Sequence, residues 1–181
     1  MARPAVLSTR TLLVCAAIGV ATGIVSGIAG LVTPAVVAAV PILYGVVLGS
    51  HVLPGIIAQQ VLRLPLVALT THLLAAFVGL AFNPAWIGRY IGTALLFGLF
   101  QEGVAALTRY RAWGAWRFYV SSLLVGAMLA AVVFVAVDLG TFPLWAQIVY
   151  LSVAVLAPAG WTAIGLGVGD GLRRAGVAPR T

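Results

Sequence analysis

The sequence has no lysine and very few acidic residues. Its 181 residues include three Asp and Glu in total, and all ten basic residues are arginine, so charged residues make up only 7% of the chain. Hydrophobic residues make up 63%, and the mean hydropathy is +1.18. No soluble domain of this length buries so much apolar surface. The apolar runs are also continuous, without the alternation of a membrane barrel strand. We therefore predict an all-α polytopic membrane protein.

The sequence also lacks the signatures of several functional classes. Its single cysteine, Cys15, lies in an apolar run, which excludes a disulfide framework. There is no Walker A loop and no dinucleotide fingerprint, so energy from ATP has to come from a partner. No HExxH spacing marks a metal site, and Ser26 has no GxSxG context. We predict a protein that is not an enzyme and has no cofactor, no resident metal and no nucleic-acid partner.

Six apolar segments form the predicted single membrane domain, residues 1–181. A span needs about 20 residues. The second segment contains GSHVLPG, whose Gly and Pro predict a kink. The basic, apolar N-terminus resembles a signal peptide, but its run is too long, so we interpret it as a retained span. The predicted spans are residues 11–32, 36–61, 65–83, 88–109, 117–138 and 145–172.

The arginines predict the orientation of these spans. If the N-terminus is cytoplasmic, only Arg89 lies outside, and the other nine lie on the cytoplasmic side, where positive charge concentrates. Both termini are then cytoplasmic. The predicted cytoplasmic arginines are Arg3, Arg10, Arg63, Arg109, Arg111, Arg117, Arg173, Arg174 and Arg180.

Three aromatic residues fall at the predicted outer boundary: Trp86, Tyr90 and Trp145. Aromatic belts at membrane interfaces explain such positions. Stacking on the rings of a ligand is the alternative.

Polar residues inside the spans are the candidate binding residues, because ionisable groups at membrane depth are costly. His72 lies nine residues after Arg63 and Glu102 seven before Arg109, which places them roughly 13 Å and 10 Å from the inner boundary. His51 lies about one turn higher. The three side chains could line one cavity, with Gln101 about 100° from Glu102 on its helix. For both histidines, a structural hydrogen bond within the bundle is the alternative.

Glu102 is the most unusual of these residues. An ionised carboxylate at a span centre costs about 2.5–3.5 kcal/mol. No basic residue lies three or four positions away, and the candidate for a cation deep in a span is His72. We predict that a cationic or amine-bearing ligand supplies the missing partner. A protonated or hydrogen-bonded carboxyl group that fixes helix packing is the alternative.

The first span contains small residues at a spacing of four, the glycines Gly19 and Gly23 and the alanines Ala17 and Ala21. Small residues at this spacing let another helix approach closely. That helix is either part of the same chain or part of a separate membrane subunit.

Three motifs point to a known family. The segment QEGVAALTRYRAW is similar to the fourth-span Glu and Tyr-Arg-x-Trp pattern of the S components of energy-coupling factor (ECF) transporters. LYGVVLG and LRLPLVA resemble the start of span two and the turn before span three. Among S components the chain looks most like the YkoE group, associated with thiamine or its hydroxymethylpyrimidine precursor. In span three it has His72 where acidic residues are expected.

The resemblance implies a function in vitamin uptake at a bacterial cell membrane. The S component would capture the vitamin outside the cell, dock on a transmembrane coupling subunit that carries two ATPase subunits, and topple to release it inside. Ala17 and Ala21, with Gly19 and Gly23, would form the docking face, and Glu102 would bind the ligand. The alternatives are another small vitamin, a metal ion, or an assembly subunit without a ligand.

Overall fold

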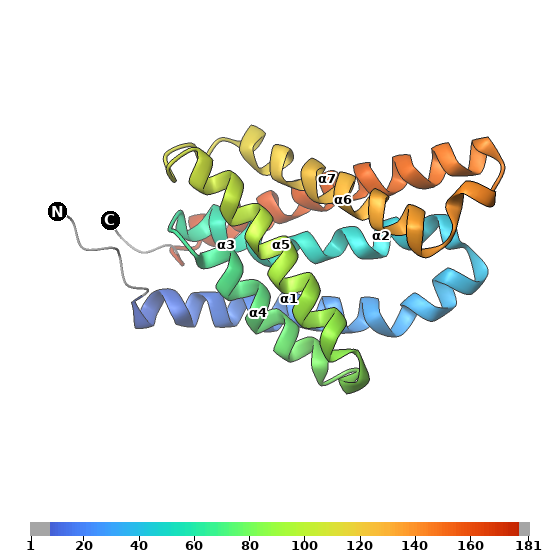
Figure 1. The fold of residues 1–181 in the computed structure, drawn as a ribbon. Helices are drawn as coiled ribbons and strands as arrows, with labels where there is room; N and C mark the ends of the chain where they lie inside the picture. The colour runs from blue at the N-terminus through green and yellow to red at the C-terminus, as the bar shows by residue number, and fades with distance from the viewer. Residues whose placement is uncertain (1–7, 178–181) are drawn as a thin grey trace.

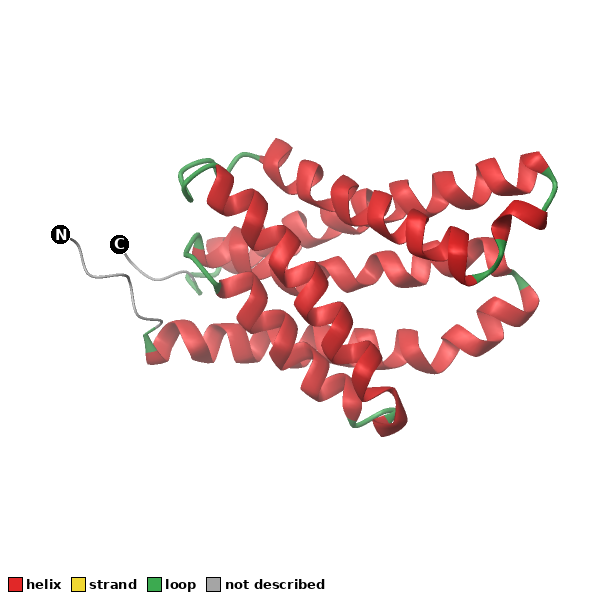
Figure 2. Cartoon of the chain, viewed as in Figure 1, coloured by secondary structure: helices red, strands yellow, loops and turns green. Residues whose placement is uncertain are grey.

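The computed structural model describes residues 8–177, which omits the predicted cytoplasmic Arg3 and Arg180. All secondary structure in this range is helical (Figure 2). The long helices are α1 (Thr9–Ala39), α5 (Ile87–Leu107), α6 (Ala115–Ala136) and α7 (Leu144–Arg174). The shorter helices are α2 (Tyr44–Gly49), α3 (Leu53–Leu62) and α4 (Val67–Leu80). Single 3₁₀ turns are η1 (Pro41–Leu43), η2 (Ser50–Val52), η3 (Pro84–Trp86) and η4 (Leu139–Thr141).

Five segments of the described chain are long and apolar enough to cross a membrane: Thr9–Ala39, Pro41–Leu62, Pro84–Leu107, Ala115–Val135 and Leu144–Arg174. The second of them combines α2 and α3. The helix α4 is apolar but has only 14 residues, about 21 Å at 1.5 Å per residue, against a hydrocarbon core of about 30 Å.

The helices form an elongated bundle with two distinct ends (Figure 1). The start of α1, the end of α7 and the α3–α4 and α5–α6 turns lie together at what we call the terminal end. The α1–α2 and α6–α7 connections lie at the opposite, distal end. The α4–α5 connection reaches neither end and lies to one side, so this hairpin is tilted across the bundle.

The second segment breaks where Gly and Pro predict a kink. The 3₁₀ turn Ser50–Val52 separates α2 from α3, and Pro54 stands in the first turn of α3. A proline is tolerated there because that turn has no helical acceptor for its missing N–H. All ten residues of α3 are buried, so this short helix is the centre of the bundle.

The predicted boundary between the first two spans, at residues 33–35, is wrong. The helix α1 continues through Pro34 to Ala39, and the chain turns at Val40 and Pro41. One internal proline removes a single backbone hydrogen bond, which membrane helices accommodate. Beside it, the Thr33 hydroxyl donates to the Ala29 carbonyl.

Glycines on α1 allow close packing against α4. A Cβ atom on Gly23 would lie 2.6 Å from the Val78 Cβ, and one on Gly19 would lie 2.8 Å from the Leu74 Cβ. Both glycines are buried. The prediction that Gly19 and Gly23 form part of a docking face for another subunit therefore needs correction, since these residues serve packing within the chain.

Candidate functional site

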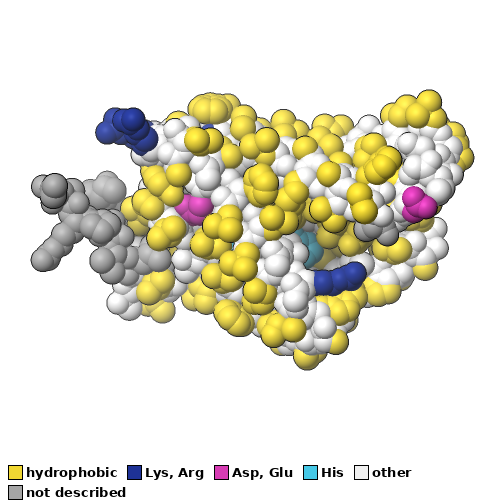
Figure 3. Space-filling model, in the orientation of Figure 1, with side chains coloured by type: hydrophobic (Ala, Val, Ile, Leu, Met, Phe, Trp, Pro, Cys, Tyr) yellow, Lys and Arg dark blue, Asp and Glu magenta, His cyan; other side chains and the backbone are white. Residues whose placement is uncertain are grey.

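A cavity of about 600 Å³ lies in the distal half of the bundle. Its walls come from the second half of α1, from α2, from the first half of α5 and from the distal part of α6. Figure 3 shows the corresponding face as largely apolar, with a hollow beside a histidine and a basic side chain. The lining residues that matter below are Gly30, Tyr44, His51, Trp86, Arg89, Tyr90, Thr93, Phe97 and Met128.

The cavity exists because the α4–α5 hairpin stops short of the distal end. The tilted α5 contributes Trp86 and Arg89 at its start and Phe97 further along. The longer helices α1 and α6 continue past the hairpin, so the space between them is left open on the α5 side (Figure 1). The size is within the range of pockets that bury small organic ligands.

Two buried polar atoms on the cavity residues have no hydrogen-bond partner: the His51 Nδ1 and the Tyr90 hydroxyl. Burying a polar group without a partner is unfavourable. The two atoms are therefore unsatisfied polar groups of residues that line the cavity.

Two glycines fix the position of Tyr90. A Cβ atom on Gly79 of α4 would lie 2.8 Å from the Tyr90 Cε1, and one on Gly30 of α1 would collide with its hydroxyl. Tyr90 is only 5% exposed. The prediction placed it in an aromatic belt or against a ligand, and the structure buries it between α1 and α4 at the edge of the cavity.

Arg89 is the basic residue of the cavity wall. Its guanidinium lies 4.8 Å from the centre of the Trp86 ring, a cation–π arrangement. No acidic side chain lines the cavity. Among the described residues, the cavity lining therefore offers no negative charge to balance a cation.

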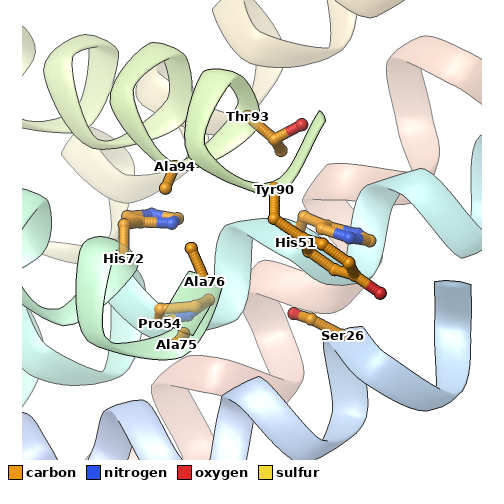
Figure 4. A pocket seen from close by; sticks show the side chains of 9 residues that line it. All are labelled: Ser26, His51, Pro54, His72, Ala75, Ala76, Tyr90, Thr93 and Ala94. Carbon is orange, nitrogen blue, oxygen red and sulfur yellow. The ribbon is translucent and has the colours of Figure 1, made fainter. Parts of the chain in front are cut away.

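A second, smaller pocket of about 20 Å³ adjoins the cavity and shares His51, Tyr90 and Thr93 with it. Figure 4 shows His72 and His51 on opposite sides of this pocket, with Tyr90 next to His51 and Ser26 just below the Tyr90 ring. Two of the three residues considered for one cavity, His51 and His72, thus line this pocket.

The polar residues behind the small pocket hydrogen-bond to one another. The His72 Nε2 lies 3.0 Å from the Gln101 Oε1, and the Gln101 Nε2 donates to the Val52 carbonyl at 3.1 Å. His72 and Gln101 are both buried. Gln101 is therefore a support for His72, with no atom lining either pocket.

Glu102 lies apart from both pockets. Its carboxylate accepts hydrogen bonds from the backbone N–H groups of Leu66 and Ala68 at 3.0 and 2.8 Å. It also accepts from the Gln59 Nε2 at 3.3 Å and from the Tyr110 hydroxyl at 3.1 Å. Burial, with the nearby Glu102 charge, raises the pKa of Tyr110 to about 12 and keeps it a donor. Four protein donors thus satisfy this carboxylate. This arrangement corresponds to the alternative in which a hydrogen-bonded carboxyl group fixes helix packing.

The premise that no deep cation is available to Glu102 is wrong. Arg117 on α6 is fully buried, with its guanidinium 4.5 Å from the Trp113 ring centre and 4.3 Å from that of Phe118. Its Nη1 donates to the Gln59 Oε1 at 3.1 Å, and Gln59 in turn donates to Glu102. Arg117 was missed because it belongs to another helix and its position in the sequence is that of a boundary arginine.

The remaining predicted residues differ in whether they line the cavity. Trp86 lines the cavity, whereas Trp145 lines neither pocket and is 65% exposed on α7. Ala17 and Ala21 are exposed on the face of α1 that points away from α4. Within the described residues, this face remains available for another helix.

Sequence reasoning missed several cavity residues, among them Tyr44, Arg89 and Phe97. Tyr44 was noted only as part of LYGVVLG. Arg89 was interpreted as an orientation signal, although an isolated arginine among aromatics at the outer boundary was a usable sign of a binding site. The glycines Gly30 and Gly79 had no distinguishing signal in the sequence.

The comparisons with known proteins agree on a membrane transport fold. A family model described as "ABC-type cobalt transport system, permease component" matches residues 10–128. A solved structure described as "Crystal structure of an S-component of ECF transporter" matches with a TM-score of 0.82 and 18% identity, over 94% of this chain and 87% of that one. A search of curated proteins gave no match. At this identity the structural likeness establishes the fold.

Proposed function

Because the chain belongs to the family of permease components of ABC-type cobalt transport systems, we propose that it is the substrate-capturing S component of an ECF transporter. The S-component fold over nearly the whole chain supports this proposal. The chain has no nucleotide-binding motif, so the proposal includes a transmembrane coupling subunit and two ATPase subunits as partners. The observation that carries it is the distal cavity with its two unpaired polar atoms.

The proposed orientation places the cavity on the outside. Arg63, Arg109, Arg111 and Arg173 all lie at the terminal end of the bundle, which positive charge assigns to the cytoplasm. The short α4 is then a sixth span, in a bacterial cell membrane, and both termini are cytoplasmic. A ligand enters the distal cavity from outside.

The proposed ligand is a small organic molecule with an aromatic ring. The cavity offers the rings of Tyr44 and Trp86 for stacking and a few polar atoms for orientation. A bare metal ion fits poorly, because no group of three or more His, Cys, Asp or Glu side chains capable of holding one occurs among the described residues. A divalent ion in this site would also have no carboxylate to compensate its charge.

Between the two specific candidates, hydroxymethylpyrimidine suits the cavity better than thiamine. Thiamine has a cationic thiazolium ring, and the cavity has Arg89 and no acidic side chain. Glu102, the proposed partner of that cation, is occupied by four protein donors. The neutral pyrimidine requires no counter-charge, and the His51 and Tyr90 atoms can bind its polar groups.

The test is a titration of the purified protein with hydroxymethylpyrimidine and with thiamine, followed by calorimetry and by tryptophan fluorescence. Trp86 in the cavity wall makes quenching on binding an expected signal. Tyr90→Phe removes the unpaired hydroxyl and is expected to weaken binding about tenfold, the value of one hydrogen bond.

Tyr150→Phe is the matched control. Tyr150 on α7 is also buried, at 2% exposure, but packs in a core cluster with Val133 and Leu139 and lines neither pocket. Its variant is expected to bind like the wild type. No heat and no quenching with either compound would reject the pyrimidine ligand, and saturable Co²⁺ binding instead would support the metal alternative that the family description suggests.

A further inference from the structure

The small pocket between His51 and His72 has room for a single polar group. Its volume of about 20 Å³ exceeds the 10–15 Å³ that one water molecule needs. It shares His51, Tyr90 and Thr93 with the lining of the large cavity, so the two spaces lie next to each other. A ligand in the cavity can therefore extend one substituent into this pocket.

The hydrogen bonds behind His72 determine which of its nitrogens accepts a proton. The Val52 carbonyl can only accept, so the Gln101 amide group turns its NH₂ toward Val52 and its oxygen toward His72. That oxygen also only accepts, so the His72 Nε2 bears the hydrogen. In the neutral ring the Nδ1 is then an acceptor with a free lone pair.

Two further contacts hold the imidazole of His72 in place. The ring packs edge-on against Phe97, with centroids 6.3 Å apart and planes at 80°. On the other side, Gly55 makes room for the Gln101 amide, since a Cβ atom there would collide with its oxygen. The His72 Nδ1 has no hydrogen-bond partner among the described residues.

The pocket contains no charge to balance an ion. Apart from the two histidines, its lining consists of hydroxyl side chains and apolar residues: Ser26, Tyr90, Thr93, Pro54, Ala75, Ala76 and Ala94. Cations are disfavoured because no carboxylate is present, and anions are disfavoured because an acceptor nitrogen faces them. A neutral group with an N–H or O–H is the complement of this pocket.

We infer that this pocket is a subsite that binds one hydrogen-bond-donating substituent of the ligand, an amino or hydroxyl group, with the His72 Nδ1 as its acceptor. The inference rests on the proposed function, because it assigns the ring of the ligand to the large cavity. It explains why a neutral histidine is held by Gln101 at this position. It also makes His72 a residue that determines specificity.

The first part of the test compares two ligands and three proteins by calorimetry. The ligands are hydroxymethylpyrimidine and its analogue in which hydrogen replaces the 4-amino group. Wild type is expected to bind the amino compound at least tenfold more tightly, since a site built for a donor disfavours an analogue that lacks it. His72→Leu is expected to abolish that preference while retaining binding of the analogue. Both ligands keep the hydroxyl group. If the hydroxyl group and not the amino group occupies the subsite, wild type binds the two ligands equally, which counts against the amino assignment. If removal of the hydroxyl group also leaves the affinity unchanged, the subsite itself is contradicted.

Thr71→Val is the matched control for folding. Thr71 is the neighbour of His72 on α4, is fully buried, and its hydroxyl donates to the Val67 carbonyl. It lines neither pocket, so its variant is expected to keep the wild-type ratio of affinities. If His72→Leu does not fold, Gln101→Met is the second variant. It removes the acceptor that keeps the hydrogen on the His72 Nε2, so it is expected to reduce the preference for the amino compound severalfold.

The second part of the test needs no ligand. In ¹⁵N-histidine spectra of the wild-type protein, His72 is expected as the neutral Nε2–H tautomer, and Gln101→Met is expected to change this signal. A His72 hydrogen on Nδ1 overturns the inference whatever the protein binds. If the pyrimidines bind equally whether or not they carry the amino and hydroxyl groups, the subsite is overturned and the proposed function stands. If no pyrimidine binds at all, the proposed function is contradicted as well. Co²⁺ binding that His72→Leu abolishes would replace the subsite by a metal site.

Discussion

The carboxylate of Glu102 stabilises two turns at once. It binds the start of α4 through the N–H groups of Leu66 and Ala68 and the α5–α6 turn through Tyr110. At α4 it takes the place of a capping side chain, where a negative charge also interacts favourably with the helix dipole. A buried acid in a membrane helix thus has a structural explanation here that the sequence of its own helix does not reveal.

Glu102→Gln is expected to lower the stability of the protein by about 2–3 kcal/mol, because hydrogen bonds to a charged group are lost and the new NH₂ group faces donors. Chemical or thermal denaturation in detergent measures this change. Asp170→Asn is the control, since its carboxylate accepts one hydrogen bond, from the Gln60 Nε2. Unchanged stability, combined with a large loss of pyrimidine affinity, would return Glu102 to the binding site.

Arg117 and Glu102 are expected to be energetically coupled through Gln59. Gln59 donates to the carboxylate and accepts from the guanidinium, so it transmits the interaction of two buried charges. Arg117→Met keeps much of the apolar packing against Trp113 and Phe118 but removes the guanidinium charge that interacts with Glu102. A double-mutant cycle of Arg117→Met with Glu102→Gln is expected to give a coupling energy of about 1–3 kcal/mol. Additive effects would mean that each group acts only on its own surroundings.

At the scale of elements, α1 presents two faces with different functions. Gly19 and Gly23 bring it against α4, while Ala17 and Ala21 remain exposed. The first face belongs to the fold, and the second is the proposed docking face for the coupling subunit.

The two faces can be separated by mutation. Gly23→Leu is expected to disrupt the fold, because even a Cβ there would lie 2.6 Å from the Val78 Cβ and 2.7 Å from the Ala75 carbonyl oxygen. Ala21→Leu, two residues away, is expected to leave melting temperature and ligand binding unchanged but to abolish copurification with the coupling subunit. Wild-type complex formation by Ala21→Leu, together with Ala17→Leu, would place the docking face elsewhere.

The elements were easier to predict from the sequence than the contacts between them. Long apolar runs and a Gly and Pro break are local properties, so the helices and the interruption before α3 follow from them. The rotation of each helix depends on its neighbours. Gln101 and Glu102 are adjacent, yet one supports His72 and the other binds the inner turns, and only the packing of α5 against α3 and α4 decides which.

The turns at the terminal end show the same limit. Arg63, Leu66, Arg109 and Tyr110 all have a positive φ, which non-glycine residues rarely adopt. Such conformations persist when surrounding contacts fix them. Glu102 supplies those contacts, to Leu66 across 36 residues and to Tyr110 across eight. No turn signal in RLPL or RYRAW predicts this.

At the scale of the whole molecule, the short α4 relates the cavity to the membrane. Its length of about 21 Å is less than the hydrocarbon core. The tilted α4–α5 hairpin therefore ends below the distal ends of α1, α6 and α7 (Figure 1). The shortfall leaves the distal half of the bundle open on one side, where the cavity lies. In the proposed orientation, the shortest span thus creates the entry for the ligand.

This orientation is testable with single cysteines, because the native Cys15 is fully buried and is expected to react slowly. Thr141→Cys lies in the exposed α6–α7 connection at the distal end, and Arg111→Cys lies in the exposed α5–α6 turn at the terminal end. In intact cells a membrane-impermeant maleimide is expected to label the first and to label the second only after the membrane is permeabilised. The reverse pattern would place the cavity on the cytoplasmic side, and an S component that captures its ligand from outside would then be ruled out. Labelling of both positions in intact cells would mean an even mixture of orientations, which the one-sided distribution of arginines argues against.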